Sequence, residues 1–182
     1  TIGELISINP SDEYDINGLL VDTIDSLKNK DTKLVKTGFK KIDSFAGGLT
    51  RGEITIVGGR PGHGKTTFLV NLVSKMRGEG HRCMLFNREL PNSEVIKKLI
   101  CRESRNLSYT MVRKGVFSDF ELNELEKVKK TICEKYNSDD FKMYDNIKNF
   151  AKTAAEVKKF KPDIVFDDYI QLIDGAAISK DD

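Results

Sequence analysis

The residues most able to do chemistry lie in a glycine-rich segment at positions 59–66. It reads Gly59-Arg60-Pro61-Gly62-His63-Gly64-Lys65-Thr66, the P-loop pattern of two glycines five residues apart followed by Lys and Thr. Glycines let the backbone turn its N–H groups inward, so the segment can surround a polyphosphate. Lys65 would reach the outer phosphates of a nucleoside triphosphate, and the Thr66 hydroxyl would bind Mg²⁺. We therefore assign residues 59–66, and Thr67 beside them, to nucleotide binding.

The segments on either side of this loop are those that a P-loop needs. The apolar run at residues 54–57 predicts a buried strand. After the loop, apolar side chains recur at helical spacing, at Phe68, Leu69, Leu72, Val73 and Met76. A helix beginning near Lys65 would add the positive end of its dipole to the phosphate site. The alternative, a strand-to-helix turn without a ligand, is disfavoured because motif and context agree.

A P-loop that holds Mg²⁺ needs a second anchor for the metal, usually an Asp at the end of a neighbouring buried strand. Residues 163–168 predict such a strand, which ends in Asp167 and Asp168. Adjacent strand residues face opposite sides, so only one of the two can point at the metal. Their spacing alone leaves both open as the anchor.

A catalytic base is also required to orient the attacking water. In one large group of P-loop ATPases a Glu directly follows the metal-anchoring Asp, but here Tyr169 follows Asp168. Glu89 lies just past the end of a strand predicted at residues 82–87, and it would approach the γ-phosphate if that strand neighbours the P-loop strand. Position alone leaves two interpretations of Glu89, a catalytic base or a solvated loop residue.

Helices and strands that alternate along the chain must position these residues. Besides the segments above, we expect a loose arm over 1–14, helices over 15–29, 40–45, 107–115 and 151–160, a helix capped by Ser93, a helix whose capping box begins at Ser118, and a strand over 141–144. This order predicts an α/β fold with a mostly parallel sheet whose ligands bind at the carboxyl ends of its strands. We place the domain boundary between residues 33 and 34.

Composition limits the remaining function classes. The chain has 182 residues and a formal charge of +2, so its bulk charge gives no evidence for a nucleic-acid partner. A cluster of basic residues predicts a solvated helix face rather than a DNA surface; it comprises Lys97, Lys98, Arg102 and Arg105. Three widely spaced cysteines indicate reduced thiols in the cytoplasm, without a metal or redox role. No apolar run approaches the roughly 18 residues of a membrane helix, so we expect no membrane partner.

Five segments together resemble the DnaB-like replicative DNA helicases, hexameric motors with a RecA-like ATPase core. They are Thr37-Gly-Phe-Lys-Lys-Ile-Asp43, Gly48-Leu-Thr-Arg-Gly52, Arg60-Pro-Gly-His-Gly-Lys-Thr66, Phe86-Asn-Arg-Glu-Leu90 and Asp168-Tyr-Ile-Gln-Leu172. The resemblance covers roughly residues 34–175. It implies that ATP and Mg²⁺ are the ligands, that Glu89 is the catalytic glutamate and that Asp168 anchors the metal.

The resemblance also implies partners. Spacing alone favours packing of the 15–29 helix on its own domain, because connected elements usually pack locally. In the helicases a helix at this position docks on the adjacent subunit of a hexameric ring, which reverses that preference. Single-stranded or forked DNA, a primase and a helicase loader are the other partners that such a motor implies.

The sequence departs from the helicase pattern at two places. Asn87 and Arg88 stand where small residues are expected before the glutamate, and Asp167 occupies a normally apolar position. These departures suggest a divergent member, such as a phage-encoded one, whose place would be the host cytoplasm. The DNA-binding loops, γ-phosphate sensor and arginine finger of the family would follow residue 172. We therefore expect 34–182 to be the nucleotide-binding half of a motor domain, with poor hydrolysis by itself.

Two other functions remain as alternatives. A RecA-like recombination, repair or clock-type ATPase shares the glycine-rich approach to the P-loop, but Asp168-Tyr-Ile-Gln-Leu172 favours the helicase. A nucleotide-gated assembly or helicase-loading module would use hydrolysis only as a timer.

Overall fold

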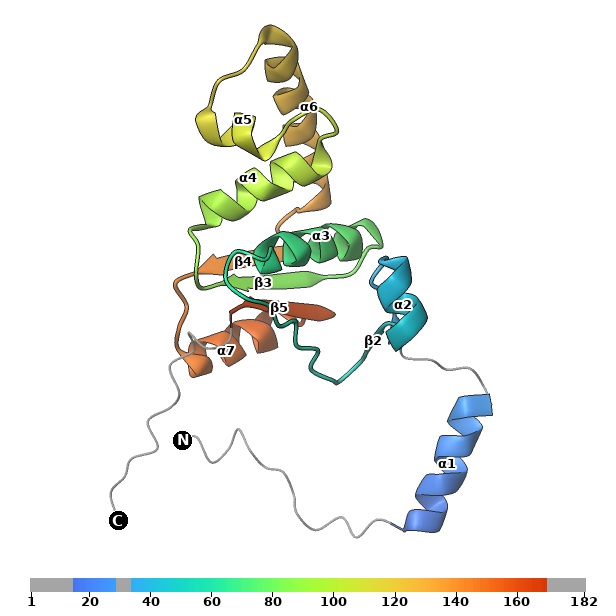
Figure 1. The fold of residues 1–182 in the computed structure, drawn as a ribbon. Coiled ribbons are helices and arrows are strands. Elements are labelled where there is room, and N and C mark those ends of the chain that lie inside the picture. Colours follow the sequence, from blue (N-terminus) through green and yellow to red (C-terminus); the bar gives the residue numbers. More distant parts are fainter. Residues whose placement is uncertain (1–14, 29–33, 170–182) are drawn as a thin grey trace, which may run out of the picture.

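The computed structural model describes residues 15–28 and 34–169 and shows an α/β arrangement (Figure 1). The helices are α1 (Ile16–Lys28), α2 (Lys40–Ala46), α3 (Lys65–Gly78), α4 (Asn92–Glu103), α5 (Tyr109–Lys114), α6 (Asp119–Lys135) and α7 (Phe150–Phe160). The strands are β1 (Leu34–Val35), β2 (Leu49–Thr50), β3 (Cys83–Asn87), β4 (Phe141–Asp145) and β5 (Ile164–Asp168). The expected arm over 1–14 and residues 170–172 of the last motif lie outside the described residues.

A parallel sheet in the order β4-β3-β5 forms the centre of the fold. Every residue of β3 is buried, because helices cover both faces of the sheet (Figure 1). Cys83 and Leu85 point into a core built with α3 and α4, whereas Met84 and Phe86 pack with Phe160 of α7. This alternation follows from strand geometry, in which successive side chains point to opposite faces. The α/β class and the parallel sheet predicted from the sequence are confirmed.

One predicted strand is wrong for the described part of the chain. Residues 54–57 form no strand, and Ile54 and Ile56 are each 84% exposed. A strand must exchange backbone hydrogen bonds with a neighbour, and within 15–28 and 34–169 no strand pairs with this segment. The strand-helix-strand unit expected from 54–57, α3 and β3 is therefore not formed there. Parallel pairing comes instead from β3 with β4 and β5.

The helix boundaries follow local chemistry with one exception. The capping box at Ser118 is confirmed, since its side chain accepts from the Glu121 N–H and the Glu121 carboxylate accepts from the Ser118 N–H. The predicted Ser93 cap is wrong. Helix α4 begins at Asn92, two residues before the start that a Ser93 cap would set, and its N-cap is Pro91, whose φ is −60° with an extended ψ of 145°.

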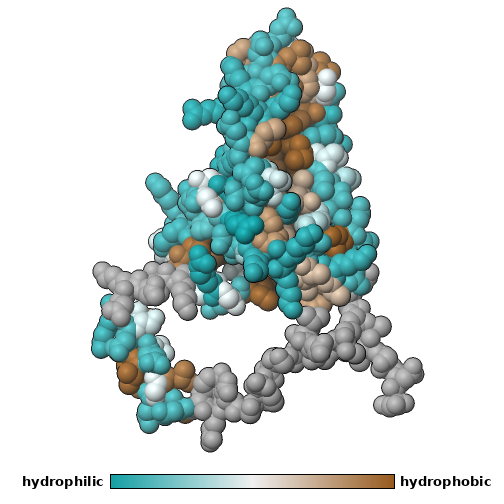
Figure 2. All heavy atoms as spheres, turned by 180° about the vertical axis from the view of Figure 1, so that it is seen from behind, coloured by the Kyte–Doolittle hydropathy of each residue, from teal (hydrophilic) through white to brown (hydrophobic). Residues whose placement is uncertain are grey.

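Helix α1 confirms the predicted helix over 15–29 but packs on nothing in the described structure. None of its residues is buried, and Ile16 and Leu27 are 78% and 73% exposed. Its apolar side chains therefore face solvent (Figure 2). The packing of this helix on its own domain, which spacing alone favours, is not what the structure shows. No helix of the described part combines the length and apolar character needed to cross a bilayer.

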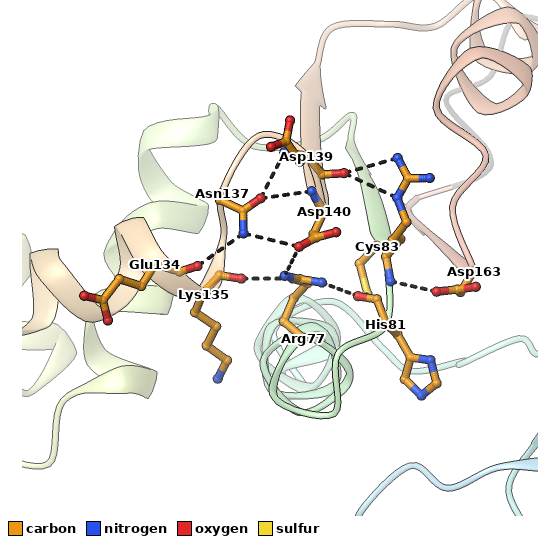
Figure 3. Close-up of polar contacts among 10 residues, drawn as sticks. Arg77, His81, Cys83, Glu134, Lys135, Asn137, Asp139, Asp140 and Asp163 are labelled. Atoms are coloured by element: carbon orange, nitrogen blue, oxygen red, sulfur yellow. Dashed lines mark hydrogen bonds and ion pairs between the residues drawn. The ribbon is translucent and has the colours of Figure 1, made fainter.

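A buried arginine joins the segments that precede β3 and β4 (Figure 3). Arg77, near the end of α3, is 5% exposed in its side chain and donates to the backbone oxygens of Lys135 and His81. It also lies 3.4 Å from a carboxylate oxygen of Asp140, just before β4. Helices α3 and α6 are thereby fixed to the same end of the sheet, opposite the end that carries Asp168.

We expect Arg77→Met to lower the free energy of unfolding by about 2–3 kcal/mol, because the buried acceptors would lose their donor. Urea titration of the purified protein measures this loss. Arg113→Met, at an exposed residue of α5, is the matched control and should change stability by less than about 0.5 kcal/mol. Equal stability of the two variants would show that the Arg77 contacts do not hold this end of the sheet.

Candidate nucleotide-binding site

The predicted P-loop forms an open turn at the start of α3. Gly62 and Gly64 have φ values of 78° and 84°, a left-handed conformation that side-chain-bearing residues rarely adopt. Residues 59–64, including Arg60, Pro61 and His63, are exposed, so the turn is accessible to a ligand. The Lys65 ammonium lies over the turn, 3.1 Å from the backbone oxygen of Gly59. The amino end of α3 and this cation both favour an anion at the same place.

Thr66 and Asp168 meet although 102 residues separate them in the sequence. The Thr66 hydroxyl donates to Oδ2 of Asp168 at 2.7 Å. Asp168 ends β5 and is 4% exposed, so its carboxylate is held in the interior at the mouth of the P-loop. A hydroxyl and a carboxylate are oxygen ligands of the kind that Mg²⁺ prefers. The two residues that the sequence assigns to the metal thus lie in contact.

Asp167 points away from the P-loop, as strand alternation requires. Its carboxylate accepts from Nε and Nη2 of Arg88 at 2.8 and 2.6 Å. This geometry favours Asp168 over Asp167 as the metal anchor. The same contact joins two of the three residues that depart from the helicase pattern, since Arg88 and Asp167 are partners of each other.

Glu89 follows the end of β3 and is exposed. The condition behind its prediction, a P-loop strand beside β3, is not met in the described residues. Glu89 nevertheless lies at the same end of the sheet as Asp168, because the Arg88 N–H donates to the Asp168 backbone oxygen at 2.7 Å. Within the described part of the chain, its carboxylate has no hydrogen-bond or salt-bridge partner. Its role as catalytic base stays a prediction.

Asn87 is a site residue that the sequence analysis noted only as a departure. It is 1% exposed and lies in register with Asp168, so both side chains face the P-loop side of the sheet. Its Oδ1 is buried and finds no hydrogen-bond donor among residues 15–28 and 34–169. Mg²⁺ usually keeps several of its waters, which are hydrogen-bond donors. A buried acceptor beside Asp168 therefore fits a hydrated metal at this place.

A groove lies beside the first turn of α3, between this helix, α4 and α5. It is lined by Thr67, Val70, Asn71, Lys98, Cys101, Arg102 and Tyr109. The Lys98 ammonium reaches 3.4 Å from the Thr67 hydroxyl and lies over the Tyr109 ring. Lys97 instead pairs with Glu94 at 2.7 Å. The two lysines of α4 therefore have different surroundings. Lys98 faces the candidate nucleotide site, whereas the charge of Lys97 is neutralised by Glu94.

The cysteines show no sign of site chemistry. Burial raises the pKa of the Cys83 thiol to about 12, so it is protonated and unreactive at neutral pH. Among the described residues, no three His, Cys, Asp or Glu side chains gather as a metal-binding group. The candidate ligands for Mg²⁺ stay the Thr66 hydroxyl and the Asp168 carboxylate, which lie in contact.

Comparison with known proteins identifies the family. The model of the DnaB-like helicase C terminal domain matches residues 35–182. The chain belongs to this family. The DnaB-like chain is 25% identical over 183 residues to the replicative DNA helicase DnaC of Bacillus subtilis (strain 168), covering 95% of itself and 39% of that protein. It is 30% identical over 166 residues to a probable replicative DNA helicase of Guillardia theta, covering 87% of itself and 27% of that protein. The chain thus spans less than half the length of these relatives.

Solved structures agree on the fold. A solved ATPase domain superposes with a TM-score of 0.71 at 21% identity, over 93% of this chain and 62% of that one. A DnaB-like replicative helicase, studied in its interactions with primase, gives a TM-score of 0.73 at 21% identity, over 99% of this chain and 45% of that one. The RecA-like α/β fold predicted from the sequence is therefore confirmed.

We expect Asp168→Asn to weaken binding of Mg²⁺-ADP by at least about tenfold, because the metal loses a charged oxygen ligand. Binding of ADP in excess EDTA should be almost unchanged. Titration calorimetry with and without Mg²⁺ measures both. Asp139→Asn makes the same change at an exposed position and serves as the control. If Asp168→Asn kept the full Mg²⁺ dependence, Asp168 would not be the metal anchor.

Proposed function

We propose that the protein containing this chain is a replicative DNA helicase that hydrolyses ATP to move along single-stranded DNA and unwind duplex DNA. The observation that carries this proposal is the 2.7 Å hydrogen bond between Thr66 and Asp168. It brings the start of the P-loop helix to the end of a buried parallel strand, which is the arrangement that nucleotide hydrolysis needs. Family membership and the names of the relatives support DNA unwinding as the use of that energy.

Each residue of the site has a proposed part in hydrolysis. Backbone N–H groups of residues 59, 60, 62–64 and Thr67 bind the phosphates, Pro61 shapes the loop without donating, and Lys65 stabilises charge on the outer phosphates. Thr66 and Asp168 would hold Mg²⁺, which would supply positive charge beside the outer phosphates. Glu89 orients a water molecule for in-line attack on the γ-phosphate and accepts its proton, while the bond from the γ-phosphorus to the bridging oxygen breaks and ADP leaves. Product release then changes the contacts between subunits.

Helix α1 is the proposed contact between subunits. Its apolar stripe consists of Ile16, Leu19, Leu20, Ile24 and Leu27, all exposed in the isolated chain. Exposed apolar side chains gathered on one helix favour docking on another protein surface. We propose that α1 docks on a second copy of the chain and that such contacts close a hexameric ring. A primase and a helicase loader are further proposed partners, the first supported by the relative studied with primase.

Strand displacement by the full-length protein tests the function. ATP-dependent unwinding of forked DNA is the expected result, with none from Lys65→Ala, because the outer phosphates would lose their cation. ATP-gated DNA binding without unwinding would overturn the helicase proposal and favour an assembly or loading module. Strand exchange without unwinding would favour a recombination ATPase.

We expect Glu89→Gln to keep ATP binding while lowering kcat by about a hundredfold or more, because the amide cannot accept the proton of the water. Single-stranded DNA-stimulated ATP hydrolysis by the full-length protein measures kcat. Glu134→Gln, on the exposed side of α6, is the matched control. Near-normal turnover by Glu89→Gln would assign the base to another residue.

We expect Ile24→Glu to weaken self-association by about tenfold or more, because a charge would enter an apolar contact. Light scattering coupled to size-exclusion chromatography, over a range of concentrations with nucleotide, measures this. Thr23→Glu adds the same charge outside the apolar stripe of α1 and should assemble like the wild type. Identical assembly of both variants would show that α1 is not an interface.

A further inference from the structure

The Arg88 side chain is the most extensively bonded charged group on the α7 side of the sheet. It is 1% exposed, and its guanidinium donates twice to the Asp167 carboxylate, at 2.8 and 2.6 Å. Its remaining donors reach the backbone oxygen of Ile147 and, at 3.3 Å, the hydroxyl of Thr153. It also lies over the Phe86 ring. One side chain thus joins the ends of β3 and β5 to the loop after β4 and the first turn of α7.

This contact immediately adjoins the proposed catalytic base and the proposed metal anchor. Arg88 directly precedes Glu89, and Asp167 directly precedes Asp168. The Arg88 N–H also donates to the backbone oxygen of Asp168. A shift of either partner would therefore be passed through one peptide unit to a proposed site residue. The hydrogen bond from the Arg88 N–H to Asp168 and the pairing of Asn87 with Asp168 restrain the backbone φ and ψ angles of that connection.

Stability alone does not explain why charges occupy these positions. Removing two charges from water costs about as much as their attraction returns, and an apolar pair of similar volume is often as stable. What an ionic pair adds is geometry, because a guanidinium and a carboxylate joined by two parallel hydrogen bonds have a fixed distance and orientation. Here that geometry fixes the two strand ends relative to each other.

We propose that Arg88 and Asp167 form a positioning pair that sets the distance between the carboxylates of their chain neighbours, Glu89 and Asp168. The pair touches neither nucleotide nor metal. It acts through the adjacent peptide units and holds the base and the metal anchor in the arrangement that hydrolysis requires. This inference rests on the proposed ATP hydrolysis and adds two residues to it.

The test compares variants of the full-length protein in DNA-stimulated ATP hydrolysis. The double variant Arg88→Met/Asp167→Leu removes both charges at similar volume, and Arg88→Lys keeps the charge but loses the double hydrogen bond. We expect the double variant to keep its Tm and its Kd for Mg²⁺-ADP while kcat falls about tenfold to a hundredfold, as for a small misplacement of reacting groups. Arg88→Lys should give an intermediate kcat.

The control removes an exposed ion pair of the same kind, Lys129→Met/Glu126→Leu on α6, and should leave kcat unchanged. A wild-type kcat in a folded double variant would overturn the positioning role. If the double variant fails to fold, Arg88→Lys is the variant that tests the proposal. A wild-type kcat of Arg88→Lys would also overturn the positioning role. Lack of hydrolysis by the wild-type protein would overturn the proposed function and this inference together, whereas hydrolysis with unaffected variants would overturn the pair alone.

Discussion

The parallel pairing of β3 with β5 is the constraint on which the rest of the site depends. Its register sets Asn87 opposite Asp168, so the ends of both strands lie at one edge of the sheet. Strand alternation then sends Asp168 toward α3 and Asp167 toward α7. Thr66 meets the first carboxylate and Arg88 meets the second. Two consecutive acidic residues thereby take different partners on opposite faces of the sheet.

The two ends of the sheet use buried polar groups differently. At the amino ends, Arg77 bonds mainly to backbone oxygens and joins α3 to α6. At the carboxyl ends, Arg88 bonds to a carboxylate, while Asn87 keeps a buried oxygen without a donor in the described residues. A buried polar atom left without a partner costs free energy unless a ligand or water supplies one. At the carboxyl edge the Asn87 oxygen is therefore left to accept from a ligand or a water molecule, whereas Arg77 at the amino edge is paired within the fold.

Much of this was predictable from the sequence because it depends on local spacing. The glycines of 59–64, the capping box at Ser118 and the apolar run of β3 each act within a few residues, and the structure forms the elements they predict. The choice between Asp167 and Asp168 was not predictable from spacing, because it depends on which face α3 covers. The Arg88–Asp167 contact was equally hidden, since 79 residues separate its partners and each alone was only a departure from a pattern.

The exposed segment 54–57 shows how the P-loop is positioned in this structure. Ile54 and Ile56, which precede the P-loop, are exposed and contact little. Helix α3, which follows the P-loop, is anchored in the core by Val70, Val73 and Met76. Lys65 and Thr66 are the first residues of that helix, so their positions follow from the packing of the helix rather than from a preceding strand. The hydrogen bond from Thr66 to Asp168 fixes the start of the helix to the sheet. The loop therefore takes its place from the helix that follows it, and this suffices to bring the proposed metal ligands together.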